Sequence, residues 1–293
     1  MLEGMRTYSL EDVHETRKRR DSWWTVYFVD PLACRAALVV ANHTNITPNG
    51  LTSASLVLGL LSAGALAAGQ LIAGAVLFYL SFMIDCVDGK VARLKGTGTP
   101  LGLWLDYVGD RFRVVCCAAG LAYGQYQATG NVDYIVLGAT VAVLDLFRYV
   151  NAPQMKRVRE VIREESAALD PAQAGSTPVD PELDGREPDG QGRSDVDFEF
   201  GGPGEGQKRR LSFLRRLNRF LARHRVRSHL ISGIEFHAAV FVVAPLLGAA
   251  ALIPVTAGAS LLLLANEIFL VYRMWLFARR YVPGEKSREH ALA

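Results

Sequence analysis

The sequence predicts an all-α integral membrane protein with six transmembrane helices and an N-terminal amphipathic helix at the membrane interface. Half (50%) of its 293 residues are hydrophobic, and its mean hydropathy is positive. This composition favours a membrane protein over a soluble pair of domains. Six apolar runs approach or exceed the length that a helix needs to cross a bilayer core of about 30 Å. They cover residues 51–68, 71–84 with a continuation towards 92, 101–123, 134–150, 234–252 and 257–277.

The basic residues lie on one side of these six runs. Lysines and arginines cluster at residues 14–20, 90–95, 111–113, 156–163, 208–227 and 279–288, whereas the turns on the opposite side, 69–70, 124–133 and 251–257, contain none. The formal net charge of only +3 hides this asymmetry. Because cytoplasmic loops of membrane proteins carry the excess of lysine and arginine, we expect both termini to face the cytoplasm, in a multi-pass protein of the plasma membrane.

Residues 1–43 are predicted to form a cytosolic and interfacial amphipathic segment. Basic residues are followed by Trp23, Trp24, Tyr27 and Phe28, and then by an apolar run. Aromatic rings beside basic residues are typical of helices that lie at the depth of the lipid headgroups. We therefore expect an entry helix along the membrane surface. Pro48 suits the first turn of the membrane helix that follows.

The rest of the chain divides into five segments by composition. Residues 44–163 hold the first four membrane helices. Residues 164–207 are rich in Asp, Glu, Gly, Pro and Ser and predict a disordered acidic linker, because they contain too little apolar surface to bury. Residues 208–232 predict a basic amphipathic helix on the membrane surface, and we expect no nucleic-acid binding because no aromatic stacking pattern accompanies the charge. Residues 233–280 hold the last two membrane helices, and 281–293 form a cytosolic tail.

An acidic motif lies where the second and third membrane helices meet. Its fixed positions read D-x2-D-G-x2-A-R-x8-G-x3-D-x3-D, from Asp85 to Asp110. One aspartate at the centre of a membrane helix costs roughly 2.5 to 3.5 kcal/mol, so four acids call for a compensating cation. Their spacing places Asp85 with Asp88, and Asp106 with Asp110, on one face of each helix. The short turn at 94–100 makes the helices antiparallel, so the two pairs are expected to face each other on the cytoplasmic side.

Oxygen ligands at this density suit Mg²⁺ or Mn²⁺, and we expect two ions. Two ions can bridge a pyrophosphate and stabilise both oxygens of an in-line displacement. Gly89 costs a helix about 1 kcal/mol relative to alanine, which indicates that a ligand approaches the backbone there. Arg93, one turn later, is placed for a phosphate or nucleotide. Ala92 and Gly102 serve either helix packing or ligand access.

These residues resemble the signature of the CDP-alcohol phosphotransferase (CDP-alcohol phosphatidyltransferase) family. The similarity covers every fixed position of the motif, and T-P-N-G-L-T at residues 47–52 resembles the entry to the family's first membrane helix. It extends over about residues 44–153, and over the last two helices by topology only. The resemblance implies phospholipid biosynthesis by a homodimer. A hydroxyl would attack the phosphorus of a CDP-linked donor such as CDP-diacylglycerol, distal to the cytidine, and CMP would leave.

The resemblance also implies roles for individual residues. The metal ligands would be Asp85, Asp88, Asp106 and Asp110, and Asp110 would also be the catalytic base that takes the acceptor's proton. The CDP-donor pocket would contain Asn49, Thr52, Gly89, Arg93 and Thr99. Members that use inositol phosphate carry a Lys-x-Arg pair near the end of the fourth helix, where this chain has Arg148 and then Lys156 and Arg157. We expect Arg148 to contact the acceptor alcohol, which can be glycerol phosphate, inositol phosphate, serine or a second lipid alcohol.

Two other functions also use acids within a membrane. An intramembrane Mg²⁺-dependent prenyltransferase divides its Asp-rich motifs between distant helices, whereas both acidic pairs here lie between residues 85 and 110. A metal-binding transporter leaves Gly89 and Arg93 without a role.

Other polar residues in the apolar runs are expected to form ion pairs with one another. Asp145 can pair with Arg148 on one helix face. Further pairing between the last two helices is expected among Glu235, His237, Asn266, Glu267 and Arg273.

Overall fold

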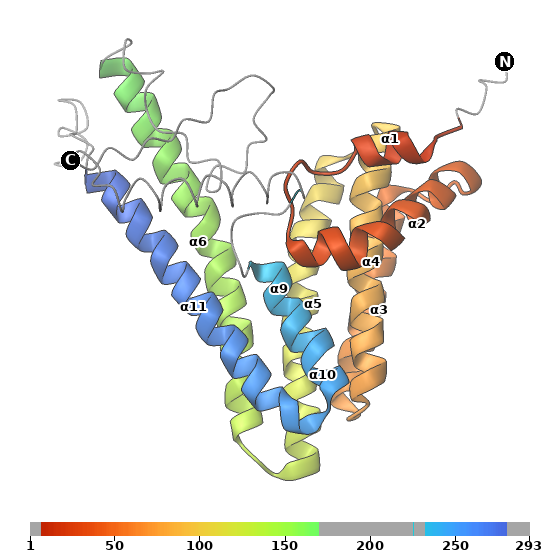
Figure 1. Ribbon diagram of the computed structural model, residues 1–293, viewed down its shortest axis with the longest axis vertical. Coiled ribbons are helices and arrows are strands. Elements are labelled where there is room, and N and C mark those ends of the chain that lie inside the picture. The colour runs from red at the N-terminus through yellow and green to blue at the C-terminus, as the bar shows by residue number, and fades with distance from the viewer. Residues whose placement is uncertain (1–6, 170–224, 226–231, 280–293) are drawn as a thin grey trace, which may run out of the picture. The chain divides into compact units, whose positions relative to one another are not determined.

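The computed structural model describes residues 7–169, 225 and 232–279, and these residues form helices and no strands (Figure 1). The all-α prediction is therefore confirmed for this part of the chain. The C-terminal tail at 281–293 and nearly all of the predicted linker and basic helix lie outside the described residues. In chain order the elements are α1 (Leu10–Glu15), η1 (Thr25–Val29, π-helical), α2 (Asp30–His43), α3 (Pro48–Ala67), α4 (Leu71–Lys95), α5 (Pro100–Thr129), α6 (Asp133–Leu169), α9 (Gly233–Ala238), η2 (Ala239–Val243, π-helical), α10 (Ala244–Leu247) and α11 (Ala249–Arg279).

The chain divides into two compact units. Unit 1 comprises residues 1–146 and 224–263, and unit 2 comprises 147–223 and 264–293. The whole acidic motif lies in unit 1. The long helices α6 and α11 contribute their first parts to unit 1 and their last parts to unit 2.

Five of the described helical stretches are long and apolar enough to cross a membrane. They are Thr25–His43, Pro48–Ala67, Leu71–Lys95, Asp133–Glu164 and Ala249–Arg279. Many large apolar side chains on them are exposed, including Val57, Leu61, Ile72, Val143 and Leu261. Such a surface fits contact with lipid and a multi-pass membrane protein.

These five stretches differ from the six predicted runs. Thr25–His43, which we expected to lie along the interface, is included because η1 continues directly into α2. Helix α5 is not included although it has 30 residues, since charged side chains near its start and glutamines near its end lower its hydropathy. The run at 234–252 is also not among the five, because its apolar helix, Gly233–Leu247, has fewer than 18 residues. The number of spans therefore stays a prediction.

The break before the last long helix lies earlier than predicted. The sequence placed a turn at 251–257, where Pro254 lies, but α11 already begins at Ala249 and includes that proline. The chain breaks instead at Gly248, whose φ of +96° is in a region that L side chains rarely adopt.

Helix α3 is the shared packing partner of α4 and α5. A Cβ atom on Gly120 of α5 would overlap the Ala63 carbonyl oxygen of α3, and a Cβ on Gly124 would overlap the Leu66 carbonyl oxygen. Small residues thus let the two backbones meet, as in many membrane helix pairs. Against α4, the Ser62 hydroxyl of α3 donates to the Gly74 carbonyl at 2.7 Å. The position of α3 therefore sets how far apart the two acidic helices lie.

Local capping determines where these helices begin and end. Helix α3 begins at Pro48, as predicted, and the Thr47 side chain accepts a hydrogen bond from the Gly50 N–H at 3.2 Å. Helix α4 ends at Lys95, followed by Gly96 with φ +65°. Thr99 then caps α5 by accepting from the Gly102 N–H at 3.0 Å. These are ordinary N-cap and C-cap devices, and they produce the short turn predicted between the acidic pairs.

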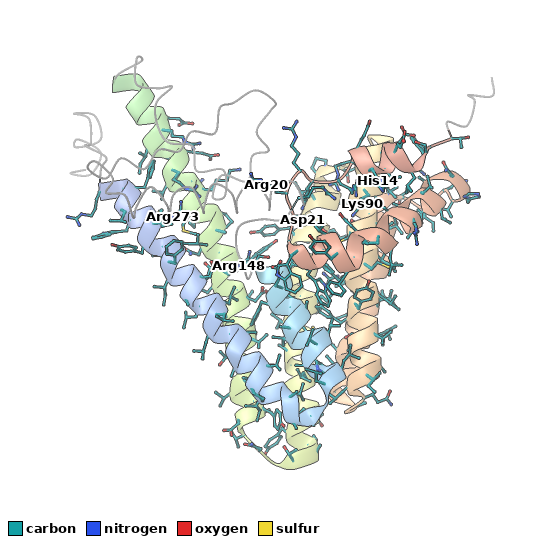
Figure 2. The ribbon with its side chains drawn as sticks, viewed as in Figure 1. His14, Arg20, Asp21, Lys90, Arg148 and Arg273 are labelled. Atoms are coloured by element: carbon teal, nitrogen blue, oxygen red, sulfur yellow. The ribbon has the colours of Figure 1, made fainter. Side chains whose placement is uncertain are left out.

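The N-terminal segment packs against the end of α4 that is predicted to face the cytoplasm. Lys90 Nζ of α4 lies 2.9 Å from Asp30 Oδ1 of α2, and both side chains are buried. The Tyr79 hydroxyl donates to the Phe28 carbonyl at 2.6 Å. Figure 2 labels Lys90 with His14 and Asp21 at this end of unit 1. The segment before α3 is thus joined to the helix that carries half of the acidic motif.

Candidate metal centre

Three acids of the motif come together between α4 and α5. One carboxylate oxygen each of Asp85, Asp88 and Asp106 lies within 4.8 Å of the others. Asp88 is buried, and the other two are partly buried. Three converging carboxylates match the oxygen ligands that Mg²⁺ and Mn²⁺ prefer. The residues present therefore fit a divalent cation. We call the place formed by these three carboxylates the Asp trio site.

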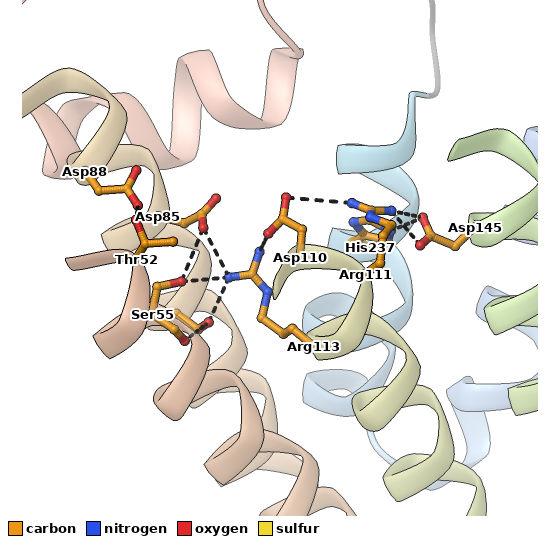
Figure 3. Close-up of polar contacts among 10 residues, drawn as sticks. Thr52, Ser55, Asp85, Asp88, Asp110, Arg111, Arg113, Asp145 and His237 are labelled. Carbon is orange, nitrogen blue, oxygen red and sulfur yellow. Dashed lines mark hydrogen bonds and ion pairs between the residues drawn. The ribbon is translucent and has the colours of Figure 1, made fainter. Parts of the chain in front are cut away.

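Hydroxyl groups of α3 hold two acids of the trio (Figure 3). The Thr52 hydroxyl makes a short hydrogen bond to Asp88 Oδ2. One turn further along α3, the Ser55 hydroxyl donates to Asp85 Oδ1 at 3.3 Å. Thr52 and Ser55 lie on the same face because they are three residues apart. A neighbouring helix thus orients the carboxylates, as the partners of metal ligands commonly do.

Asp110 lies beside the trio and is held by two arginines of its own helix. Arg113 Nη2 makes a short ion pair with Asp110 Oδ1, and Arg111 Nη2 lies 3.7 Å from Asp110 Oδ2. The same Arg113 guanidinium reaches Asp85 Oδ1 at 3.7 Å. Figure 3 shows this guanidinium between the two acids. Asp110 does not join the trio within the described residues, so its role as a fourth ligand stays a prediction.

Among the other residues predicted for the donor pocket, Asn49 lies beside Thr99, and Arg93 lies over Gly89. Asn49 Nδ2 donates to Thr99 Oγ1 at 3.3 Å, across the starts of α3 and α5. A Cβ on Gly102 would overlap Asn49 Oδ1, so the glycine leaves room for the Asn49 side chain in this position. Separately, Arg93 Nη1 lies 3.4 Å from the place of a Cβ on Gly89. The Arg93 guanidinium therefore lies over Gly89, at a distance that a Cβ atom would tolerate.

Arg93 is also bound by the segment that precedes the membrane helices. Its Nε donates to the Thr16 carbonyl oxygen at 2.8 Å. This contact links positions 77 residues apart in the chain, and nothing in the local pattern of the motif indicates it.

Asp145 has different partners from the one predicted. Arg111 Nη1 of α5 donates to Asp145 Oδ1 at 2.6 Å, and His237 Nε2 of α9 lies 2.7 Å from the same oxygen. Asp145 is only 1% exposed, and a buried carboxylate needs charged partners. The sequence placed Arg148 within reach on the same helix, but it could not show which neighbouring helices face Asp145.

Arg148 belongs to unit 2 and lies in a separate polar cluster. Its Nε is 3.4 Å from Glu267 Oε1 of α11, and Asn151 Nδ2 donates to Glu267 Oε2 at 3.3 Å. Figure 2 labels Arg148 on α6 and Arg273 on α11. The expected contact between Arg148 and an acceptor stays a prediction.

Sequence reasoning missed Ser55, Arg111 and Arg113. The signal for Arg113 was available, because it follows Asp110 by one helical turn on the same face. The signal for Ser55 was its spacing of three residues from Thr52. Arg111 follows Asp110 directly, and only the packing of α6 and α9 shows why its guanidinium turns towards Asp145.

A comparison with protein families identifies the part of the chain that contains this site. Residues 45–167 match the model of the CDP-alcohol phosphatidyltransferase family. A search of curated proteins finds no match to this chain. The matched part runs from the entry to α3 into α6 and includes the Asp trio site and Asp110. Divalent metals are used by this family, in agreement with the donor set described above. Residues 45–167 are therefore similar to the CDP-alcohol phosphatidyltransferase domain, and the apolar helices fit a multi-pass membrane protein.

Proposed function

We propose that this protein transfers the phosphatidyl group of CDP-diacylglycerol to the hydroxyl of an acceptor alcohol in phospholipid biosynthesis, with release of CMP. The observation that carries the proposal is the convergence of Asp85, Asp88 and Asp106 within 4.8 Å, with Asp110 beside them. Phosphoryl transfer needs mainly positioning and neutralisation of charge. A cluster of carboxylates that can hold divalent cations supports both requirements.

The metal would be Mg²⁺ or Mn²⁺, in two ions, with Asp110 completing the ligand set. When bound, the ions would neutralise the pyrophosphate of the donor and the charge that develops on the leaving phosphate. Thr52 and Ser55 would keep Asp88 and Asp85 turned towards the metal through the hydrogen bonds described above.

The remaining residues would bind the donor and accept the proton. Arg93 would contact the phosphates over Gly89, and the pair Asn49 and Thr99 would contact the cytidine end. Asp110 would take the proton of the acceptor hydroxyl as its oxygen forms a bond to the phosphorus distal to the cytidine. The bond from that phosphorus to the bridging oxygen breaks, CMP leaves with the electron pair, and Asp110 returns the proton to solvent.

The acceptor and the cellular setting belong to the proposal as well. Arg148 would contact the acceptor. The basic clusters on one side of the apolar runs support a site that faces the cytoplasm, where Mg²⁺ and CDP-linked donors occur. We also propose localisation in the plasma membrane and assembly as a homodimer, which the membrane character and the family resemblance support.

CMP release from purified protein tests the proposal. CDP-diacylglycerol is supplied with glycerol phosphate, inositol phosphate, serine or a lipid alcohol in turn, with Mg²⁺ or with EDTA. We expect release with one acceptor, in Mg²⁺ only, and a loss of at least about a hundredfold in Asp110→Asn because the base is removed.

Three results would contradict the proposal. The first is the absence of CMP release with any CDP-alcohol and acceptor. Release of pyrophosphate from an isoprenoid diphosphate would instead favour the prenyltransferase. Mg²⁺ flux into proteoliposomes without any transfer would favour the transporter.

A further inference from the structure

We propose that Arg113 is a positioning residue that holds Asp110 and Asp85 in the geometry that metal binding and transfer require. This inference rests on the proposed function, which gives Asp110 the proton-accepting role. Arg113 lies on α5 one turn after Asp110, outside the fixed positions of the acidic motif.

The Arg113 guanidinium has partners on three helices. Its Nη2 pairs with Asp110 of its own helix. Its Nη1 donates to the Ser55 hydroxyl of α3 at 2.9 Å and to the Ser81 hydroxyl of α4 at 3.0 Å, and it lies 3.7 Å from Asp85 Oδ1. Arginine presents several donors in a rigid planar fork, so one side chain can fix groups in several directions at once. The two acids from different helices are therefore tied to one rigid group.

The surrounding helices make a dedicated place for this side chain. Arg113 is only 3% exposed, and a buried charge is strongly destabilising unless it is paired. A Cβ on Gly59 of α3 would overlap Arg113 Cγ and Cδ, so a glycine leaves the space that the side chain occupies. Its Cζ also lies 5.9 Å from the centre of the Phe78 ring. This extent of accommodation is more than a surface ion pair needs.

The neighbouring arginine has a different attachment, which separates the two roles. Arg111 donates to Asp145 and belongs, with His237, to a cluster of α5, α6 and α9. Its distance to Asp110 is 3.7 Å. Arg113 is thus the arginine whose contacts centre on Asp110 and Asp85 and on the serines beside them.

Replacing Arg113 with lysine separates the positioning of the acids from the effect of the positive charge. Arg113→Lys keeps the positive charge beside the carboxylates, so electrostatic competition with a metal ion is preserved, but the fork is lost. Any weakening of metal binding in this variant therefore results from a changed geometry of the acids and not from a changed charge. Arg159→Lys is the matched control, because Arg159 is a buried arginine of unit 2 that donates to the Met155 carbonyl of its own helix.

The experiment measures Mn²⁺ binding by electron paramagnetic resonance, and CMP release, for full-length protein in detergent. We expect Arg113→Lys to weaken Mn²⁺ binding by about tenfold and to lower kcat by about tenfold or more, as is typical when a group that orients metal ligands is lost. The KM for the donor should stay within about threefold, because the donor contacts are untouched. Arg159→Lys should leave the Mn²⁺ dissociation constant within about twofold.

A double variant tests whether Arg113 acts through Asp110. In the Asp110→Asn background and at saturating Mg²⁺, where weaker metal binding through Asp85 no longer limits the rate, Arg113→Lys should have little further effect on the residual rate, since Asp110 is already changed. Additive losses would contradict this coupling. Should Arg113→Lys fail to fold, Ser81→Ala removes one of its acceptors and is expected to weaken Mn²⁺ binding in the same direction by a smaller factor.

The outcomes distinguish this inference from the proposed function. Unchanged Mn²⁺ binding in folded Arg113→Lys, or in Ser81→Ala where the lysine variant does not fold, overturns the inference even if the wild type releases CMP. If the wild type releases no CMP with any donor, the proposed function fails, and Mn²⁺ binding still decides whether Arg113 positions the acids.

Discussion

At the scale of single residues, hydroxyl groups on α3 are as important to the site as the acids. Thr52 and Ser55 do not belong to the acidic motif, yet they hydrogen-bond Asp88 and Asp85. Because the acids lie on α4, their orientation depends on a neighbouring helix. A carboxylate without these partners could turn away from the metal.

Thr52→Val tests this dependence. Valine has nearly the shape of threonine but cannot donate to Asp88, which is buried. We expect Mn²⁺ binding to weaken by about tenfold, in line with the loss of a partner to a metal ligand, and helix content by circular dichroism to stay unchanged. Thr140→Val is the control, because Thr140 is exposed and donates to the Val136 carbonyl of its own helix. Equal Mn²⁺ affinity of the two variants would show that Thr52 does not orient Asp88.

The residue scale also separates what a sequence can predict from what it cannot. The acid spacing predicted which carboxylates share a helix face, and Asp85 and Asp88 of the first pair lie together with Asp106 of the second, whereas Asp110 does not join the trio. The partner of Asp145 was not predictable in the same way, because a local spacing offers Arg148 whereas the fold brings Arg111 and His237. Spacing along one helix shows which residues are close in sequence, and pairing between helices depends on the rotation of each helix about its axis.

At the scale of elements, the junction of α3 with α5 determines the separation of the acidic helices. Gly120 and Gly124 lie against carbonyl oxygens of α3. Backbone atoms cannot rotate away as a side chain can, so an added methyl group must push the helices apart. The position of Asp106 relative to Asp85 would change with them.

Gly120→Ala is predicted to be harmful and Gly64→Ala to be harmless. The new Cβ at residue 120 meets the Ala63 carbonyl, whereas a Cβ at residue 64 has nothing within 4 Å. We expect Gly120→Ala to lower stability by about 1 to 3 kcal/mol through overpacking, and to reduce Mn²⁺ binding as well. Thermal unfolding in detergent and metal titration measure both effects. A Gly120→Ala protein as stable as Gly64→Ala would mean that the two helices do not depend on close contact.

Helix boundaries were predicted well where a local cap determines them. Pro48 after Thr47, and Pro100 after Thr99, begin α3 and α5, and both starts can be read from residue type. The break before α11 was predicted at the wrong place, because Pro254 is tolerated inside the helix and Gly248 takes the positive φ. The competing signals were both local, and only the packing of the chain decides between them.

At the scale of the whole molecule, the segment before the matched domain is part of the structure that supports the site. The family match begins at residue 45, yet Asp30 pairs with Lys90 inside the motif, and the Thr16 carbonyl accepts from Arg93. Arg225, from beyond the matched domain, also reaches Asp30 at 3.2 Å. Contacts from both flanking parts of the chain therefore meet at Asp30, which pairs with Lys90 of α4.

Removing one member of the buried pair should cost more than removing both. Lys90→Met leaves Asp30 with one fewer cation, and loss of one partner of a buried pair costs about 3 to 5 kcal/mol. We expect Asp30→Asn combined with Lys90→Met to recover part of this loss, because no charge of the pair then stays buried alone. Thermal unfolding of the single and double variants gives the coupling free energy between Asp30 and Lys90. Additive losses would show that the pair does not join α2 to α4.

The central claim is that the Asp trio site binds the divalent cation on which CMP release depends. The most direct measurement is the rate of CMP release from CDP-diacylglycerol and the productive acceptor as Mg²⁺ is titrated, for the wild type and Asp106→Asn. We predict that wild-type release rises from zero to saturation, and that Asp106→Asn needs at least about tenfold more Mg²⁺ or shows no release, since a ligand is lost. Release that persists in EDTA, or an unchanged Mg²⁺ requirement in Asp106→Asn, would contradict the claim.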